Sequence, residues 1–227
     1  MRATENKAAA HTRPQHVAVD WSMTGKTVLF TGASGGIERF AAIELARLGA
    51  EILIVGHNRA RGDAAAGAIR STGGSAHFLR ADMRHSAGIR ARRGCARAEP
   101  RIDVLIHSAG GIAPSGGRTR EGVDRGFAQN FLGAFLLIRL LEERLLARAP
   151  ARVIAVGSGA HKLLKSIDLD ELMGPGKAAP RRSKYQRGNF QMRSYQTAKL
   201  AVTTWTYGLA RRWAAGASPP TCSTPAS

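Results

Sequence analysis

The chain has 227 residues, of which 44% are hydrophobic, so it is long enough to bury the core of one ordinary domain and is not disordered throughout. Its longest uncharged apolar stretch, Phe131–Ile138, is far shorter than the ~20 residues that a bilayer-spanning helix needs. The formal net charge of +18 allows an anionic partner, but the basic residues are spread along the chain apart from short runs such as Arg90–Arg93.

The first predicted elements alternate between strand and helix. Lys26–Phe30 is a short, largely apolar and β-branched run that ends in a glycine-rich turn, which predicts a buried strand of a parallel sheet. Apolar residues then recur at helical spacing from Ile37 to Leu48, and Gly49 is placed to end this helix. Glu51–Gly56 predicts a second strand. Strand, helix and strand within about 30 residues form a βαβ unit, whose crossover we expect to be right-handed.

The alternation continues along the chain. We predict a helix at Arg61–Arg70, strands at Ala76–Ala81 and Arg101–His107, a long amphipathic helix at Val123–Leu146, and a fifth strand at Ala151–Ser158. This pattern predicts the α/β class, as a doubly wound parallel sheet of the Rossmann type. The sequence accordingly divides into a flexible N-terminal tail (1–22), one α/β domain (23–213) and a Pro/Ser/Thr-rich disordered tail (214–227).

The turn after the first predicted strand, TGASGG, carries Gly32, Gly35 and Gly36. Glycines at a strand-to-helix junction let backbone N–H groups approach a pyrophosphate, and the helix N-terminus adds partial positive charge. We therefore predict a dinucleotide-phosphate site, with an ordinary tight turn as the alternative. Glu38 stands where this motif has its third glycine, so its bulk and negative charge predict weakened cofactor binding.

The end of the second predicted strand indicates which dinucleotide is preferred. An acid that recognises the ribose hydroxyl is expected there in an NAD-binding protein, but this chain has His57, Asn58 and Arg59 and no carboxylate. Arg59, with His57, suits a 2′-phosphate, so the sequence favours NADP(H) over NAD(H). An ordinary surface arginine in a loop is the alternative.

Four further positions indicate acid–base chemistry. Tyr195 and Lys199 lie four residues apart in a predicted helix, so both side chains lie on one face. An ammonium beside a phenol favours the phenolate, which suits a general acid or base. Ser158, at the end of the fifth predicted strand, can hydrogen-bond a substrate oxygen or cap the next turn. Asn130 lies among apolar neighbours and is either a structural hydrogen-bonding residue or a link in a polar network.

These residues belong to motifs that resemble the short-chain dehydrogenase/reductase family, in particular its retinol-dehydrogenase and WW-domain-oxidoreductase branch. The matching segments are TGASGGI, HNRARGDAAAGAIR, FLRADM, RIDVLIHSAG, FAQNFLGAFLL, RVIAVGSGAHK and YQTAKLA, and they extend over about Lys26–Arg212. The resemblance implies that residues 23–213 form a dinucleotide-binding oxidoreductase domain. It implies hydride transfer between C4 of the nicotinamide of NADP(H) and the carbon of an alcohol or carbonyl substrate.

The resemblance also implies a role for each matching residue. Tyr195 would donate or accept the proton, and Lys199 would support it and bind the nicotinamide ribose. Ser158 would polarise the substrate oxygen, Asn130 would hold a water of the proton relay, and Asp82 would contact the adenine. The cofactor-binding positions are Gly32, Ser34, Gly35, Gly36, Ile37, His57, Asn58, Arg59, Asp82, Ala109, Gly110, Tyr195 and Lys199.

The chain departs from the family pattern at several places. His107 and Ser108 stand where the family has two asparagines, a change expected to affect sheet packing near the adenine side. The long separation of Ser158 from Tyr195 predicts an insertion around Lys165–Arg193 over the substrate cleft. After Trp213 the family's C-terminal strands have no counterpart, so we expect a truncated fold in which the fifth strand is a bare sheet edge. A catalytically impaired nucleotide-binding protein of the same fold is therefore the alternative function.

Other classes of site and partner find less support. Cys95 and Cys222 have no redox or metal-ligand spacing and the seven histidines form no metal-binding pair, so we predict a reducing, cytoplasmic location and no metal site. The expected partner is a small-molecule alcohol or carbonyl compound. A basic nucleic-acid-binding protein is the weaker alternative, no membrane association is expected, and the sequence leaves substrate identity and homo-oligomer formation open.

Overall fold

The computed structural model describes residues 22–89, 101–112, 117–148, 150–164, 167, 172, 184–214 and 221–223. All but the last residue of the predicted N-terminal tail, the Arg90–Arg93 run and Cys95 therefore lie outside the described residues, as does much of the predicted insertion that precedes Tyr195. None of the helices in these ranges is both long enough and apolar enough to cross a membrane.

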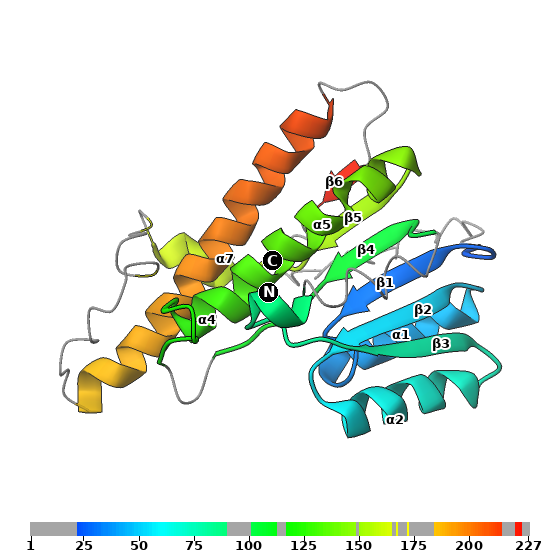
Figure 1. Cartoon of the computed structure of the whole chain (residues 1–227), viewed down its shortest axis with the longest axis horizontal. Coiled ribbons are helices and arrows are strands. Elements are labelled where there is room, and N and C mark those ends of the chain that lie inside the picture. The colour runs from blue at the N-terminus through cyan, green and yellow to red at the C-terminus, as the bar shows by residue number, and fades with distance from the viewer. Residues whose placement is uncertain are drawn as a thin grey trace, which may run out of the picture.

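The described residues form one parallel sheet with the strand order β3-β2-β1-β4-β5-β6 (Figure 1). Its strands are β1 (Thr27–Thr31), β2 (Glu51–Gly56), β3 (Ser75–Arg80), β4 (Val104–His107), β5 (Arg152–Ala155) and β6 (Thr221–Ser223). The helices are α1 (Gly36–Arg47), α2 (Arg59–Arg70), α4 (Arg125–Phe127), α5 (Gly133–Ala147) and α7 (Lys184–Ala214), with a π-helical turn η1 (Ala128–Leu132) and a 3₁₀ turn η2 (Gly159–Leu163). This arrangement confirms the predicted Rossmann-type α/β fold.

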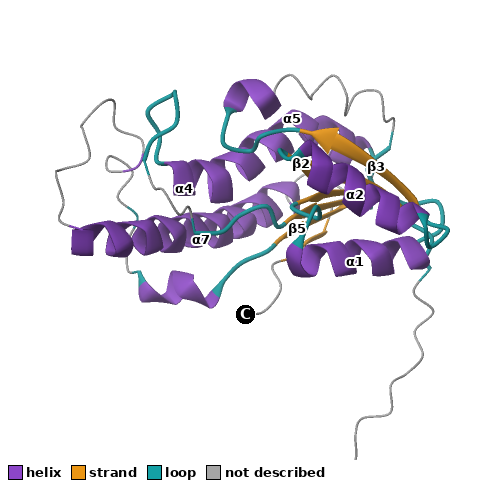
Figure 2. Cartoon of the chain, turned by 90° about the horizontal axis from the view of Figure 1, so that it is seen from below, coloured by secondary structure: helices purple, strands orange, loops and turns teal. Residues whose placement is uncertain are grey.

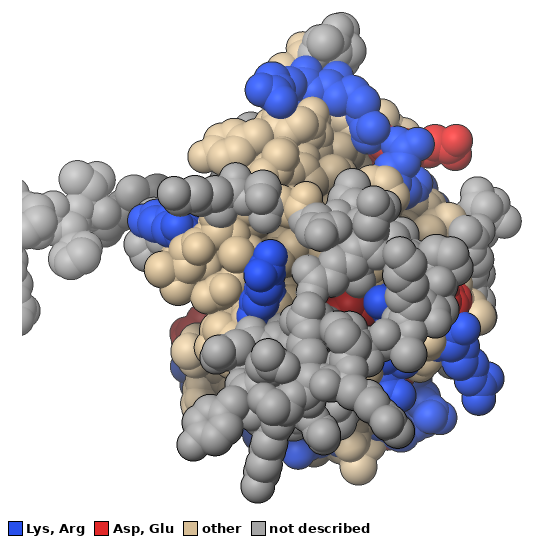
Figure 3. Space-filling model, turned by 90° about the vertical axis from the view of Figure 1, so that its left-hand side faces the viewer, with Lys and Arg blue, Asp and Glu red and all other residues tan. Residues whose placement is uncertain are grey.

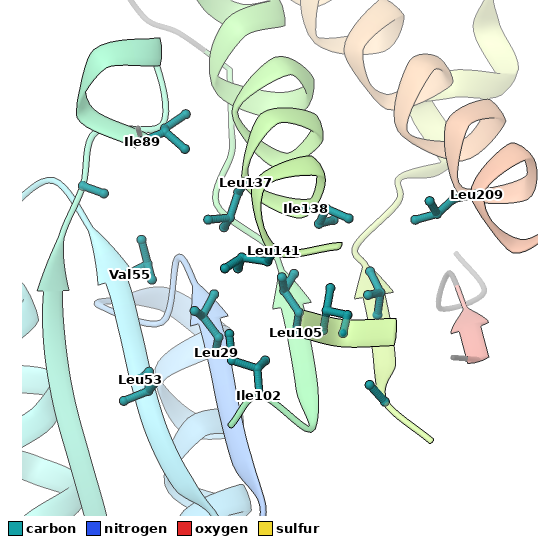
Figure 4. Close-up of a cluster of buried hydrophobic side chains, with 14 of the residues drawn as sticks. Leu29, Leu53, Val55, Ile89, Ile102, Leu105, Leu137, Ile138, Leu141 and Leu209 are labelled. Carbon is teal, nitrogen blue, oxygen red and sulfur yellow. The ribbon is translucent and has the colours of Figure 1, made fainter. Parts of the chain in front are cut away.

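Helices cover both faces of the sheet because successive strand residues point to opposite sides. Val28 and Ile52 belong to a buried cluster with residues of α1 and α2. Leu29 and Leu53 point to the other face, into a cluster completed by α5 and by Leu209 of α7 (Figure 4). Figure 2 shows α1 and α2 on one side of the molecule and α5 and α7 on the other.

The structure divides the predicted long helix and shortens the fifth strand. The segment Val123–Leu146 is not one regular helix, because α4 and α5 are separated by the π-helical turn that contains Asn130. The strand β5 ends at Ala155, so Ser158 lies in the loop beyond the strand instead of at its tip. Amphipathic periodicity does not detect the π turn, because such a turn inserts one residue without altering the apolar pattern on either side.

The expectation of a bare edge at the fifth strand is wrong over three residues. Thr221–Ser223, within the segment predicted as a disordered tail, pairs with β5 in parallel register from Arg152↔Thr221 to Ile154↔Ser223. A strand this short, flanked by prolines, carries too little apolar patterning to be recognised in the sequence.

Candidate functional site

The turn between β1 and α1 brings its backbone close to the loop after β4. Gly32 has φ +92°, and a Cβ at this position would lie 2.8 Å from the backbone nitrogen of Ala109. Only glycine allows the turn to approach the loop after β4 this closely. Gly36 also has a positive φ, of 64°, and the N-cap residue of α1, Gly35, has no side chain to cap the first N–H groups. These N–H groups suit an anion.

The Glu38 side chain folds back over this glycine turn. One carboxylate oxygen accepts a hydrogen bond of 2.8 Å from the Ser108 hydroxyl. The other lies 2.8 Å from the point that a Cβ at Gly36 would occupy. The fold thus accommodates a side chain at this position by directing it toward Ser108 in the loop after β4. The carboxylate lies at the turn itself, so the expected repulsion between its negative charge and a bound phosphate stays a prediction.

The ends of β1 and β4 are joined by a buried polar link. The side chains of Thr31 and His107 are 2.9 Å apart, measured from Oγ1 to Nδ1, and these two residues are register partners in the sheet. The Thr31 hydroxyl oxygen also accepts the N–H groups of Ser108 and Ala109, at 3.3 Å and 3.2 Å. Burial lowers the pKa of His107 to about 4, so its imidazole is neutral at neutral pH.

Asn130 is fully buried and braces the loop that follows Ala109. Its side-chain oxygen accepts from the Gly111 N–H at 2.8 Å, and its amide nitrogen donates to the carbonyls of Gly111 and Gly126 at 2.9 Å and 2.8 Å. A Cβ at Gly110 would lie 2.3 Å from the Asn130 side-chain oxygen, so glycine is required there too. The side chain of Asn130 therefore has a structural role, because it binds the backbone of Gly111 to that of Gly126. Its role in holding a relay water stays a prediction.

Tyr195 and Lys199 lie on one face of α7, at the end of the sheet where β5 finishes. The Lys199 ammonium donates a hydrogen bond of 2.8 Å to the carbonyl of Val156 and lies 5.7 Å from the centroid of the Tyr195 ring. Lys199 is only 4% exposed. Burial lowers the pKa of Lys199, while the negative charge of Glu38 acts in the opposite direction. Tyr195 itself is partly exposed.

Ser158 lies two residues beyond the carbonyl that Lys199 contacts, and its turn η2 packs against α7. Its hydroxyl oxygen accepts the N–H of Ala160 at 3.3 Å and so caps η2. This cap confirms one of the two roles expected for Ser158. It also leaves the hydroxyl proton available to a ligand, because the hydroxyl acts in this bond as the acceptor.

The residues expected to select the dinucleotide lie on the surface at the start of α2. The Asn58 side chain caps α2 by accepting the N–H of Arg61 at 3.0 Å, and His57, Asn58 and Arg59 are exposed. The Arg59 guanidinium forms a 3.0 Å ion pair with Asp63. An exposed pair of this kind is weak enough to be exchanged for a phosphate.

The carboxylate of Asp82, the predicted adenine contact, is held by Arg84. Two hydrogen bonds of 2.9 Å and 2.7 Å join the carboxylate to the guanidinium, and a third comes from the Arg84 N–H. Partial burial raises the pKa of Asp82, but the bonds from Arg84 outweigh it and hold the pKa at about 2. This ion pair fixes the segment at the end of β3.

Two features of the site were not recognised in the sequence: the link from Thr31 through His107 to Asn130, and the bond between Glu38 and Ser108. The available signals were a threonine directly before the first glycine and two unusual residues, His107 and Ser108, at the corresponding end of β4. Residues at equivalent ends of adjacent parallel strands lie side by side. The contact between Thr31 and His107 could therefore have been predicted from the sequence.

On the face that Figure 3 shows, the lysine and arginine side chains of the described residues lie in several separate groups. Several described arginines also pair with acids, among them Arg59 with Asp63, Arg101 with Asp103, and Arg212 with Glu142. This distribution gives no added support to a nucleic-acid-binding role.

Known proteins resemble this chain over most of its length. Residues 26–165, more than half of the chain, match the family model for short chain dehydrogenases. Dehydrogenase/reductase SDR family member 13 of Bos taurus is 42% identical over 144 residues, which cover 62% of this chain and 38% of that protein. Human retinol dehydrogenase 13 is 34% identical over 201 residues, which cover 84% of this chain and 55% of that protein.

Among solved structures, a short-chain dehydrogenase of Sphingobium yanoikuyae in complex with NADPH is 27% identical, with a TM-score of 0.66. The match covers 88% of this chain and 69% of that one. The chain spans about two fifths of the bovine relative and about half of the human one.

The buried, neutral state of His107 predicts a pH dependence of stability. Its folded pKa of about 4 lies below the ordinary value of 6.5. Above pH 6.5 neither the folded nor the unfolded state is protonated, whereas between 6.5 and 4 the unfolded chain alone takes up the proton. The free energy of unfolding should therefore fall by about 3 kcal/mol as pH falls through this window. Denaturant unfolding of the parent chain and His107→Asn at several pH values measures it. The expectation fails if both proteins lose the same stability.

Proposed function

Because the chain belongs to the short-chain dehydrogenase family, we propose that it is an oxidoreductase that transfers a hydride between NADP(H) and an alcohol or carbonyl carbon. The observation that carries this proposal is the placement of Lys199, with Tyr195 on the same helical face, against the carbonyl that follows β5. In an open α/β sheet this carboxyl end of the strands is where ligands bind.

The residues at the β1–α1 turn fit a dinucleotide. The close approach of Gly32 to Ala109 and the first turn of α1 favour the pyrophosphate, with Ser34, Gly35, Gly36 and Ile37 along the same turn. Asp82, Ala109 and Gly110 would lie beside the adenosine half. When bound, this group supplies the nicotinamide carbon that accepts or donates the hydride.

The chain's own residues handle the proton. In the direction of alcohol oxidation, the Tyr195 phenolate takes the hydroxyl proton while the carbon loses its hydride, which leaves a carbonyl product. In reduction, the Tyr195 phenol returns the proton to the carbonyl oxygen. The Lys199 ammonium lies over the Tyr195 ring, and only one of its three N–H groups is used by Val156. The Ser158 hydroxyl donates to the substrate oxygen and orients it.

The preference for NADP(H) over NAD(H) rests on the end of β2. His57, Asn58 and Arg59 are exposed there, and the exposed Arg59–Asp63 pair can release the guanidinium to a 2′-phosphate. The similar structure from Sphingobium yanoikuyae, which contains NADPH, supports the same choice. The substrate class follows from the relatives' names, retinol dehydrogenase and dehydrogenase/reductase, and is a small-molecule alcohol or carbonyl compound. A cytoplasmic location remains a prediction from the sequence, which leaves homo-oligomer formation open.

A catalytically impaired nucleotide-binding protein of the same fold is the second candidate, and Glu38 is the observation that favours it, because weaker cofactor binding lowers turnover. Its carboxylate lies over the glycine turn, where it opposes a bound phosphate. NADPH binding by the parent chain without oxidation by any ketone or aldehyde would select this second function.

Replacement of Tyr195 tests the proton-transfer role. Tyr195→Phe keeps the ring and removes the hydroxyl, so NADPH oxidation with a panel of aldehydes and ketones should slow by about 10²–10⁴-fold, while NADPH binding measured by fluorescence is retained. Tyr207→Phe is the matched control, because Tyr207 lies on the same helix and is 63% exposed. An active Tyr195→Phe protein would remove Tyr195 from the mechanism.

Replacement of Glu38 tests the charge conflict at the phosphate turn. Glu38→Gln keeps the size of the side chain and removes its charge, and Glu38→Gly removes both. We expect each to bind NADPH about fivefold more tightly, since a like charge at ~4 Å costs about 1 kcal/mol in water. Titration by NADPH fluorescence at low salt measures the effect. Equal affinities in all three proteins would show that the carboxylate does not oppose the cofactor.

A further inference from the structure

His107 is a buried titratable residue that the proposed mechanism does not use. It is the last residue of β4, is only 1% exposed, and lies next to Thr31 at the end of β1. Its two ring nitrogens contact groups from two different parts of the chain. Nδ1 lies 2.9 Å from the Thr31 hydroxyl, and Nε2 lies 3.3 Å from the backbone carbonyl oxygen of Asn130.

The chemistry of these two partners fixes the roles of the ring nitrogens. A carbonyl oxygen only accepts, so Nε2 carries the hydrogen and donates it to Asn130. In the neutral ring Nδ1 is then an acceptor, and the Thr31 hydroxyl donates to it. The oxygen of that hydroxyl is left to accept the N–H groups of Ser108 and Ala109, as the structure has it. One imidazole thereby sets the direction of the hydroxyl that holds the loop after β4.

The second contact reaches the other half of the same loop. The Asn130 carbonyl lies in the π-helical turn η1, and the Asn130 side chain holds Gly111 by two hydrogen bonds. The bond from His107 fixes the backbone from which that side chain extends. The segment from Ser108 to Gly111, which contains the predicted cofactor contacts Ala109 and Gly110, is therefore held at one end through Thr31 and at the other through Asn130.

We propose that His107 is a positioning residue that ties the glycine turn after β1 and the Ala109–Gly110 loop into one rigid cofactor-binding wall. The inference deepens the proposed function and rests on it. His107 need not touch the cofactor. It acts through Thr31, directly before Gly32, and through Asn130, so its effect should appear as order in the loop before any cofactor is added.

Amide side chains can restore each half of this link separately. The Asn side chain ends at the δ position, so His107→Asn can accept from Thr31 but is too short to reach the Asn130 carbonyl. The Gln side chain ends at the ε position, so His107→Gln can donate to that carbonyl. His107→Leu fills similar space and supplies neither bond. The surface variant His77→Gln is the control, because the His77 side chain is 60% exposed.

Amide hydrogen exchange of the cofactor-free proteins tests the proposal. The reporters are the Ala109 N–H, held by Thr31, and the Gly111 N–H, held by Asn130. We expect both to exchange at least about tenfold faster in His107→Leu. In His107→Asn only Gly111 should lose protection, in His107→Gln only Ala109, and in His77→Gln neither. NADPH affinity should fall about tenfold in His107→Leu and less in the two amide variants.

Unchanged exchange in the His107 variants would overturn the proposal. So would an equal loss of protection throughout the sheet, because that indicates general destabilisation. If His107→Leu does not fold, the opposite patterns of the two amide variants decide. A parent chain that does not bind NADPH refutes the proposed function, whereas the exchange pattern of the cofactor-free proteins still judges the role of His107.

Discussion

The close contact between the turn after β1 and the loop after β4 is the constraint on which the site depends. It joins the two central strands where the strand order reverses, which is the ligand-binding point of open α/β sheets. A side chain at Gly32 would collide with the backbone of Ala109, so one glycine determines whether the contact exists. The first turn of α1 and the loop braced by Asn130 both take their positions from it.

Buried polar groups surround this contact, and each of them has a partner. Thr31, His107 and Asn130 form one hydrogen-bonded chain, and Lys199 donates to a backbone carbonyl at the end of β5. A fully satisfied buried network specifies a single arrangement, whereas an apolar core tolerates repacking. The lowered pKa of Lys199 reflects the cost of burying a charge. Buried charged and polar groups that cluster in this way are typical of functional sites.

The sequence predicted the strands with strong apolar runs and the helices between them, because burial on both faces leaves a clear pattern. It also identified the glycine turn and the Tyr195–Lys199 pair, whose spacing is local. It missed β6, which is held by pairing with β5 instead of by its own patterning. It also missed the His107 link, because this depends on three segments that are far apart in the chain. The sequence also identified Ser158, but β5 ends at Ala155, so Ser158 lies beyond the strand and caps η2.

Replacement of Gly32 by alanine is the most direct measurement of the central claim, with Gly73→Ala as the matched control. Both glycines have similar positive φ values, +92° and +83°, but a Cβ at Gly73 would meet nothing within 4 Å. Both variants therefore place an alanine at a similarly positive φ, and only Gly32→Ala breaks the contact with Ala109. NADPH titration should show binding by the parent and Gly73→Ala and a loss of at least about tenfold in Gly32→Ala. Equal binding by all three would contradict the account.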